Sequence, residues 1–195
     1  MGVSQKGDQP GQASHYYSLT RLQVEGRIRL DDQVLKVRGQ AWMDHEFGTG
    51  QLSTEQVGWD WFSLQLDNQF EIMLYQLRRK DGSLAPNSSG TVVSPEERAT
   101  HLRLKQFQVR SSRIWTSPET GISYPVEWVV EIPGFDCRLK VLALLEAQEL
   151  DTRSSTGIVY WEGAVEIKGR WQGREVAGVG YVELTGYGDG GRPHI

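Results

Sequence analysis

Apolar and polar residues alternate along most of the chain after about residue 18, and a period of two is typical of a β-strand with one buried face. The alternation begins within residues 21–27, pauses at Asp31-Asp32 and resumes over Val34–Arg38, which predicts a hairpin. Residues 1–18 are polar and contain glycine and proline, so we expect a flexible lead there.

The next segment alternates strictly enough to assign faces. Trp59, Trp61 and Ser63 fall on one face of the predicted strand, and Phe62 and Leu64 fall on the other. Further strands separated by turns are predicted at Phe70–Leu77, Leu102–Val109, Tyr124–Ile132, Cys137–Leu145, Ile158–Lys168 and Val176–Tyr187.

Helix signals are almost absent. Only Ser94–Thr100 reads as a helix start, with Ser94 as N-cap and Pro95 at the first helical position. Many short strands with tight turns predict an all-β fold, either an up-and-down barrel or a sandwich. A closed barrel of about eight strands has room inside for side chains or for one small ligand.

Composition narrows the classes of partner and environment. The chain has 195 residues with 38% hydrophobic residues, enough for a real core, and a net charge of −4 gives no basic footprint for nucleic acid. The longest apolar run, Val141–Leu145, is too short to span a membrane. The first residues lack the apolar segment of a secretory signal, and a single cysteine excludes an internal disulfide.

The seven tryptophans allow two interpretations. Trp59, Trp61 and Trp161 lie in strands where polar residues alternate with them, which favours a lined cavity inside the barrel. The indoles could equally fill the barrel as ordinary core.

The densest group of titratable residues is Asp44-His45-Glu46, bracketed by Trp42 and Phe47. In a strand, Asp44 and Glu46 would point to one side and His45 to the other. An acid at an apolar rim would have a raised pKa and could donate a proton near neutral pH. The alternative is that both acids are solvated or paired with arginine, and that the histidine is structural. The remaining histidines show no ligand spacing, so no metal site is predicted.

A second polar cluster lies near the C-terminus. Tyr160 and Glu162 share a face of one strand, and Tyr181 and Glu183 share a face of the next. Glutamates on the inner face of a barrel would need polar partners, whereas outward-facing ones would be ordinary surface residues.

Five ordered motifs give the chain a family resemblance that runs from Tyr16 to Tyr187. They are Trp-Met-Asp-His-Glu-Phe-Gly at 42–48, Gly-Trp-Asp-Trp-Phe at 58–62, Met-Leu-Tyr at 73–75, Tyr-Trp-Glu-Gly at 160–163 and Gly-Tyr-Val-Glu-Leu-Thr-Gly-Tyr at 180–187. The chain therefore resembles the AttH/CrtC lipocalin-like family, which includes carotenoid 1,2-hydratase.

The resemblance implies a lipocalin-like antiparallel β-barrel. Family members usually carry two such barrels in a chain about twice this length. Residues 19–50 would then hold the end strands of a first, missing barrel together with the Asp-His-Glu junction, and 51–190 would form the C-terminal barrel. The resemblance also implies a periplasmic or secreted location and a possible association with an ABC transporter.

The implied activity is acid-assisted addition of water to a double bond of a hydrophobic, isoprenoid-like substrate, with no cofactor. Asp44, His45 and Glu46 would be the catalytic groups. The aromatic and polar side chains expected to bind the substrate are Trp42, Trp59, Trp61, Tyr75, Tyr160, Trp161, Glu162 and Tyr181.

The alternative function is a non-catalytic carrier of a lipophilic small molecule. It is motivated by the lining tryptophans and by Gln76, which follows Tyr75 where the hydratase pattern has an acidic residue. Hydrolase activity finds no support, because no paired nucleophile and base is visible.

Overall fold

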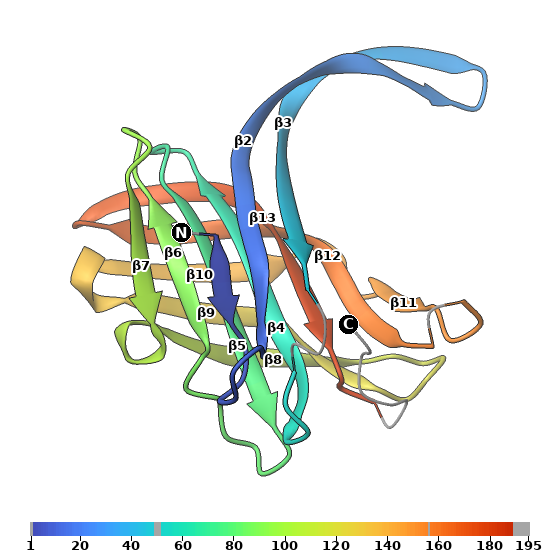
Figure 1. Cartoon of the computed structure of the whole chain (residues 1–195). Helices are drawn as coiled ribbons and strands as arrows, with labels where there is room; N and C mark the ends of the chain where they lie inside the picture. The colour runs from blue at the N-terminus through green and yellow to red at the C-terminus, as the bar shows by residue number, and fades with distance from the viewer. Residues whose placement is uncertain (1, 49–51, 156, 189–195) are drawn as a thin grey trace.

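The structure is a computed structural model that describes residues 2–48, 52–155 and 157–188. Its strands form two antiparallel sheets (Figure 1). The first sheet contains β1 (Val3–Gln5), β2 (Ala13–Leu30) and β3 (Gln33–Phe47). The second contains β4 (Gln56–Leu66), β5 (Glu71–Arg79), β6 (Ser89–Val93), β7 (Ala99–Arg103), β8 (Gln108–Thr116), β9 (Ser123–Ile132), β10 (Cys137–Ala143), β11 (Glu149–Asp151), β12 (Val159–Trp171) and β13 (Arg174–Thr185).

The large sheet curls on itself. Its strand order is β7-β6-β5-β4-β13-β12-β10-β9-β8, with β11 added beside β12. The short 3-10 helix η1 (Leu104–Gln106) carries the chain from β7 to β8, which are the two ends of this order. A second one, η2 (Pro133–Phe135), joins β9 to β10. The predicted all-β, antiparallel class is confirmed.

Three local predictions differ from the structure. Residues 2–18, expected to be a flexible lead, contain β1 and the start of β2, and Ser14 is buried there. The helix expected at Ser94–Thr100 is a hairpin turn, in which the Glu97 amide donates to the Ser94 carbonyl. The strand expected at Leu102–Val109 is interrupted by η1, because the chain there crosses from one end of the sheet to the other.

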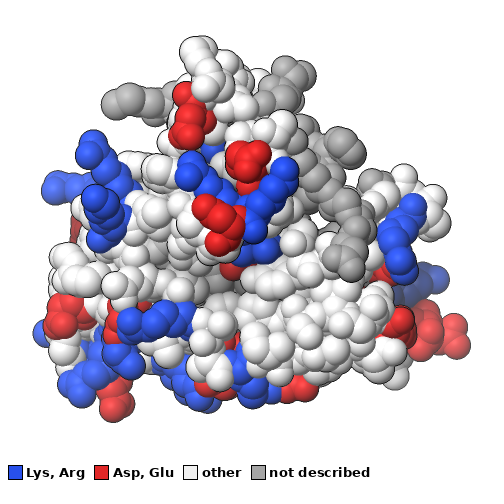
Figure 2. All heavy atoms as spheres, turned by 90° about the horizontal axis from the view of Figure 1, so that it is seen from below, with Lys and Arg blue, Asp and Glu red and all other residues white. Residues whose placement is uncertain are grey.

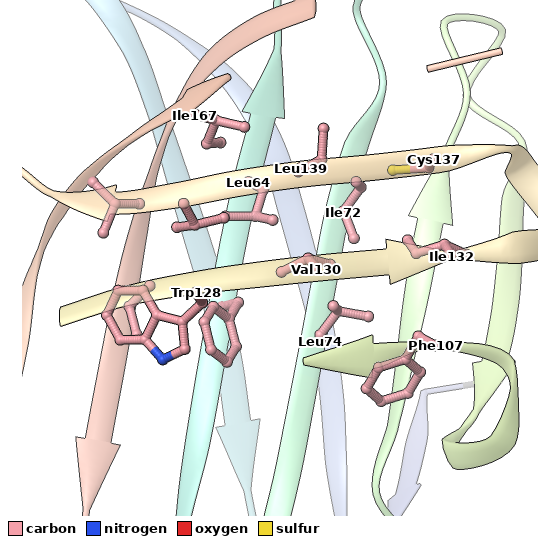
Figure 3. Packing of buried hydrophobic residues seen from close by; sticks show 14 of the residues in the cluster. Leu64, Ile72, Leu74, Phe107, Trp128, Val130, Ile132, Cys137, Leu139 and Ile167 are labelled. Carbon is pink, nitrogen blue, oxygen red and sulfur yellow. The ribbon is translucent and has the colours of Figure 1, made fainter. Parts of the chain in front are cut away.

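The interior of the curled sheet is packed with side chains (Figure 3). Trp128 and Trp161 are 1% and 0% exposed, and their ring centroids lie 6.0 Å apart. Phe62 packs edge-on against Trp128, with 5.6 Å between centroids. The placement of Trp161 in a ligand site is therefore wrong: its indole belongs to the core.

The outer face of the same sheet carries a second, smaller apolar cluster. Phe62 and Leu64 of β4 point into the core, whereas Trp59 and Trp61 point outward, as the alternation predicted. The outer cluster contains the buried Leu52, Met73, Tyr75, Leu77 and Ala85, with Tyr16, Trp42, Trp59 and Trp61 packed against it.

Tyr16 and Trp42 reach that cluster from the small sheet, because β1 and the lower halves of β2 and β3 lie over the outer face (Figure 1). Lys6, which follows β1, forms an ion pair with Glu46 at 2.9 Å, and its carbonyl accepts from Gln56 Nε2 at 2.7 Å. Arg21 of β2 forms an ion pair with Glu71 of β5. The Lys6–Gln56 hydrogen bond and the Arg21–Glu71 ion pair fix the small sheet to the large one, whereas the Lys6–Glu46 ion pair lies within the small sheet and the segment after β1.

The upper half of the β2–β3 hairpin rises away from the large sheet and curves over (Figure 1). The register of the two strands shifts between Leu19 and Leu22, and most residues beyond that point are exposed. Its exposed apolar side chains are Leu22, Val24, Ile28, Leu30, Val34 and Leu35.

Charged side chains of both signs are interspersed on the face seen in Figure 2, with no extended patch of one sign. Among the described residues, no helix is long and apolar enough to cross a membrane.

Candidate functional site

A pocket of about 670 Å³ lies between the outer face of the large sheet and the small sheet that covers it. Four strands of the large sheet supply its floor, and β2, β3 and Lys6, which follows β1, supply its roof. Leu52, which precedes β4, also lines the pocket. The floor residues are Trp59, Trp61, Ser63, Gln65, Tyr75, Leu77, Glu162, Val179, Gly180, Tyr181 and Glu183. The roof residues are Lys6, Tyr16, Gln40, Ala41, Trp42, Asp44 and Glu46.

Asp44 is held at the roof by two donors. Trp42 Nε1 donates to its Oδ1 at 2.7 Å, and the Tyr16 hydroxyl donates to its Oδ2. Trp61 Nε1, from the floor, donates to the Tyr16 oxygen at 3.2 Å. Burial and the negative charge of Asp44 raise the pKa of Tyr16 well above its ordinary value. Tyr16 therefore stays protonated and links floor to roof.

Glu46 has a cation as its partner. The Lys6 ammonium lies 2.9 Å from its Oε1, and the Ser14 hydroxyl donates to the same oxygen. Lys6 also lies over the Tyr75 ring, 4.4 Å from the centroid. The charge of Glu46 is thus balanced at one end of the pocket.

Glu183 lies on the floor without such a partner among the described residues. Trp59 Nε1 donates to its Oε1 at 3.2 Å, and Glu162 is its cross-strand partner on β12. Burial, reinforced by the negative charge of Glu162, raises the pKa of Glu183 to about 7. The pocket therefore contains a carboxyl group that is about half protonated at neutral pH.

Tyr181 shares the floor with the two glutamates. Burial and the negative charge of Glu162 raise its pKa to about 12. Next to it, Gly180 packs tightly against β4, since a Cβ there would lie 2.4 Å from the Ser63 carbonyl oxygen. Glycine at position 180 therefore allows the close approach of the β13 and β4 backbones.

The structure brings together most of the predicted site residues. Those that line the pocket are Trp42, Asp44, Glu46, Trp59, Trp61, Tyr75, Glu162 and Tyr181. His45 does not: it lies on the opposite face of β3, where its Nδ1 is 2.9 Å from the Tyr17 hydroxyl. Tyr160 is not among the lining residues, and Trp161 is in the core. Period-two alternation explains both outcomes, because His45 lies between Asp44 and Glu46 and Trp161 precedes Glu162, all three of which face the pocket.

Three titratable lining residues, Lys6, Tyr16 and Glu183, were not predicted as part of the site. Lys6 and Tyr16 lie in the segment expected to be flexible, so no signal marked them beyond the start of the family resemblance at Tyr16. Glu183 shares a face with Tyr181 in the sequence pattern, and that spacing is the signal that could have identified it.

Comparisons with known proteins agree with this architecture. A solved structure assigned as AttH, from Nitrosomonas europaea, superimposes with a TM-score of 0.85 at 37% identity, covering 95% of this chain and 56% of that one. Kievitone hydratase from Nectria haematococca superimposes with a TM-score of 0.76 at 20% identity, covering 94% of this chain and 55% of its own. Dehydratase asqC of Emericella nidulans is 27% identical over 179 residues, covering 88% of this chain and 50% of its own length.

These superpositions confirm the lipocalin-like fold that the motifs predicted. The chain spans about half the length of the relatives it matches. The model of the AttH-like family matches residues 1–187, and the chain belongs to that family.

Proposed function

We propose that this protein is a hydratase-type lyase that adds water to a double bond of a hydrophobic, isoprenoid-like substrate, or removes it in the reverse direction. A similar chain is named a dehydratase and a structurally similar one a hydratase. The two names describe one equilibrium approached from opposite sides, so a single set of acid and base groups serves both.

The observation that carries the proposal is Glu183. A carboxyl group with its ordinary pKa near 4.3 is almost entirely ionised at neutral pH and has no proton to give. Burial and the charge of Glu162 raise the pKa of Glu183 to about 7, inside a pocket walled by Trp59 and Trp61. Groups with a pKa near the working pH are the most effective general acids and bases.

In the proposed reaction, Glu183 transfers its proton to the less substituted carbon of the double bond. The π electron pair forms the new C–H bond and leaves a tertiary cation, which the faces of Trp59 and Trp61 stabilise. A water oxygen then forms the C–O bond, and the surplus proton returns to the Glu183 carboxylate. One water is consumed and the enzyme is restored; elimination follows the same steps in reverse.

Asp44 faces the same space from the roof. Its carboxylate is fixed by Trp42 Nε1 and the Tyr16 hydroxyl, so its orientation does not depend on the substrate. A fixed negative charge near a developing carbocation lowers the free energy of that intermediate. We assign Asp44 this electrostatic role and the positioning of water, with Tyr16 as its positioning residue.

The pocket volume suits a small hydrophobic molecule. About 670 Å³ lies within the range of roughly 300–1,000 Å³ typical of ligand sites. A carotenoid would place only its terminal isoprenoid unit there. We therefore propose an isoprenoid-like chain end, rather than a particular carotenoid, as the part of the substrate that reacts.

A carrier of lipophilic molecules is the second candidate. The observation in its favour is Leu77, which brings an apolar side chain from β5 to the floor beside Tyr75. A pocket used only for binding would gain from such apolar lining and would not depend on Glu183.

Turnover by carboxyl variants decides between the two. We expect the wild type to convert farnesol to a hydrated product that carries ¹⁸O from labelled water, detected by mass spectrometry. Glu183→Gln should lower the rate at least about 100-fold, as expected for loss of a general acid. Asp44→Asn should also lower it, whereas Glu175→Gln, an exposed position on the same strand, should leave it unchanged.

Binding must be measured beside turnover. Farnesol should quench tryptophan fluorescence equally in the wild type and in Glu183→Gln, which separates chemistry from folding. Unchanged turnover in Glu183→Gln would remove this residue from the mechanism. Quenching without any product in the wild type would favour the carrier.

A further inference from the structure

A second hollow lies on the outer face of the large sheet, beside the pocket. It has a volume of about 770 Å³ and extends over β5, β6 and β7 beneath β1. Tyr16 and Tyr75 line both hollows, so the two meet at these side chains. At this junction the Ser4 and Tyr75 hydroxyls lie 3.0 Å apart.

One row of cross-strand partners runs from the pocket, past Tyr75, to the second hollow. Each member is paired in register with the next across β13, β4, β5, β6 and β7. The row consists of Glu183, Trp61, Tyr75, Ser89 and Arg103. It starts at the carboxyl group of Glu183 and ends at the guanidinium group of Arg103.

The neighbouring row on the same face also ends at a basic residue. It runs from Tyr181 through Ser63, Met73 and Thr91 to His101. Leu102, between the two basic residues, is 2% exposed and belongs to the core, so His101 and Arg103 face outward. Both line the second hollow.

The two hollows differ in charge. The pocket is lined by the carboxyl groups of Asp44, Glu46, Glu162 and Glu183, with Lys6 as its cation. The lining of the second hollow includes Arg103 and His101 and, within the described part of the chain, no carboxyl group. Across those same residues, no carboxylate forms an ion pair with Arg103.

We propose that the second hollow, through Arg103, binds an anionic head group of the substrate, so that the natural substrate is an unsaturated isoprenoid acid lying along this row. The placement of the alkene beside Glu183 rests on the proposed function. The placement of the head group at Arg103 rests on the row of cross-strand partners and on the difference in charge between the two hollows. His101 lies beside Arg103 and supports the same carboxylate. A guanidinium suits a carboxylate because it can donate two parallel hydrogen bonds.

The row also sets the length of the substrate. Four strand spacings of about 4.8 Å separate Glu183 from Arg103, which is about 19 Å between the backbones. An extended carbon chain advances about 1.3 Å per bond. About a dozen chain atoms, together with the reach of the two side chains, therefore span the row, which suits a farnesyl chain better than a geranyl chain.

The test compares an acid, an alcohol and a shorter acid as probes. Farnesoic acid, farnesol and geranic acid are titrated at low ionic strength, and binding is followed by quenching of tryptophan fluorescence. We expect farnesoic acid to bind the wild type at least about fivefold more tightly than either of the others, and salt to reduce the difference.

Two arginine variants, one at Arg103 and a control at Arg98, test the role of the guanidinium group. Arg103→Gln should abolish the preference for the acid over the alcohol, whereas Arg98→Gln, an exposed arginine in the turn between β6 and β7, should retain it. Equal binding of acid and alcohol by the wild type, no binding of farnesoic acid, or equal losses in the two variants would overturn the proposal. Preference for the acid without any hydrated product would instead leave Arg103 assigned and contradict the proposed hydratase activity.

Discussion

At the scale of single residues, the chemistry of the pocket depends on which cation or hydrogen-bond donor compensates the negative charge of each carboxyl group. Glu46 has the Lys6 ammonium, and Asp44 accepts hydrogen bonds from Trp42 and Tyr16. Glu183 accepts one hydrogen bond from an indole and faces a like charge. The protonated form of Glu183 is therefore favoured, and two predictions follow from its pKa.

The rate of hydration should fall as the pH rises through about 7, because the proton donor is then lost. Above the pKa of Glu183 we expect a tenfold decrease for each pH unit, measured as kcat/KM for farnesol. A rate that stays constant between pH 6 and pH 9 would contradict the assignment of Glu183 as the acid.

The raised pKa of Glu183 should also make the free energy of unfolding depend on pH. The folded pKa of about 7 lies above the unfolded value near 4.3, so the folded state binds more protons between these limits and stability falls as the pH rises through this window. Glu183→Gln removes the destabilisation that ionisation of Glu183 causes in the folded state. Allowing for partial exposure, the variant should gain about 1–2 kcal/mol over the wild type between pH 5 and pH 8 in urea unfolding. An equal difference at both pH values would show that the carboxyl group is not perturbed.

Period-two alternation predicted many of the residue positions in the pocket. It placed Asp44 and Glu46 on one side of β3, and Trp59 and Trp61 on one side of β4. The same rule, applied to Trp161, would have placed its indole opposite Tyr160 and Glu162. The pKa of Glu183 was beyond sequence analysis, because it arises from neighbours on other strands.

At the scale of elements, a buried ionic cluster fixes the end of β13 on the reverse side of the floor. The Arg78 Nε lies 2.9 Å from Asp60 Oδ1, and the Tyr187 hydroxyl donates to Asp60 at 3.0 Å. Arg78 also donates to the Thr185 carbonyl and lies over the Tyr187 ring, 3.9 Å from the centroid. Burial raises the pKa of Asp60, and the charge of Arg78 opposes this.

Arg78→Met should destabilise the fold by about 3–5 kcal/mol, because it leaves Asp60 buried without its cation. The double variant Asp60→Leu with Arg78→Met should recover a large part of this loss, since the uncompensated charge is gone. Denaturant unfolding of the two single variants and the double variant measures the coupling. Additive losses would show that the two side chains act independently.

The β2–β3 hairpin is a second element whose two halves differ. The sequence predicted the hairpin and its turn, because both signals are local. That its lower half would cover a site depended on contacts such as Arg21 with Glu71, which are distant in sequence. The same holds for Lys6 and Tyr16, which only the folded chain brings to the pocket.

The upper half of the hairpin exposes apolar side chains and open strand edges, which favour association between copies. Replacing Ile28 and Val34 by serine should change the free energy of unfolding by less than about 0.5 kcal/mol, because both are about half exposed. Sedimentation velocity should show less self-association than in the wild type. A large loss of stability would mean that this half is packed against the sheet.

At the scale of the whole molecule, the two faces of the curled sheet have different roles, one in stability and the other in the proposed chemistry. The inner face carries the core around Trp128 and Trp161, and the outer face carries the pocket. Composition could not decide which face the indoles occupy, because closure of a sheet depends on non-local pairing. Of the two interpretations, Trp128 and Trp161 follow the one in which indoles fill the interior, and the pocket lined by Trp59 and Trp61 lies outside the curled sheet.

This division predicts opposite consequences for two tryptophans. Trp128→Ala should cost about 3–5 kcal/mol of stability, as expected for a large core side chain. Trp61→Ala should cost much less and should weaken quenching by farnesol. Unfolding and quenching measured on both variants test this, and similar losses of stability would contradict it.

The most direct test of the central claim is a crystal structure of the protein with bound farnesol. We predict electron density for the ligand between the two sheets, in contact with Trp61 and with the alkene beside the Glu183 carboxyl group. Density inside the curled sheet, against Trp128 and Trp161, would contradict the account.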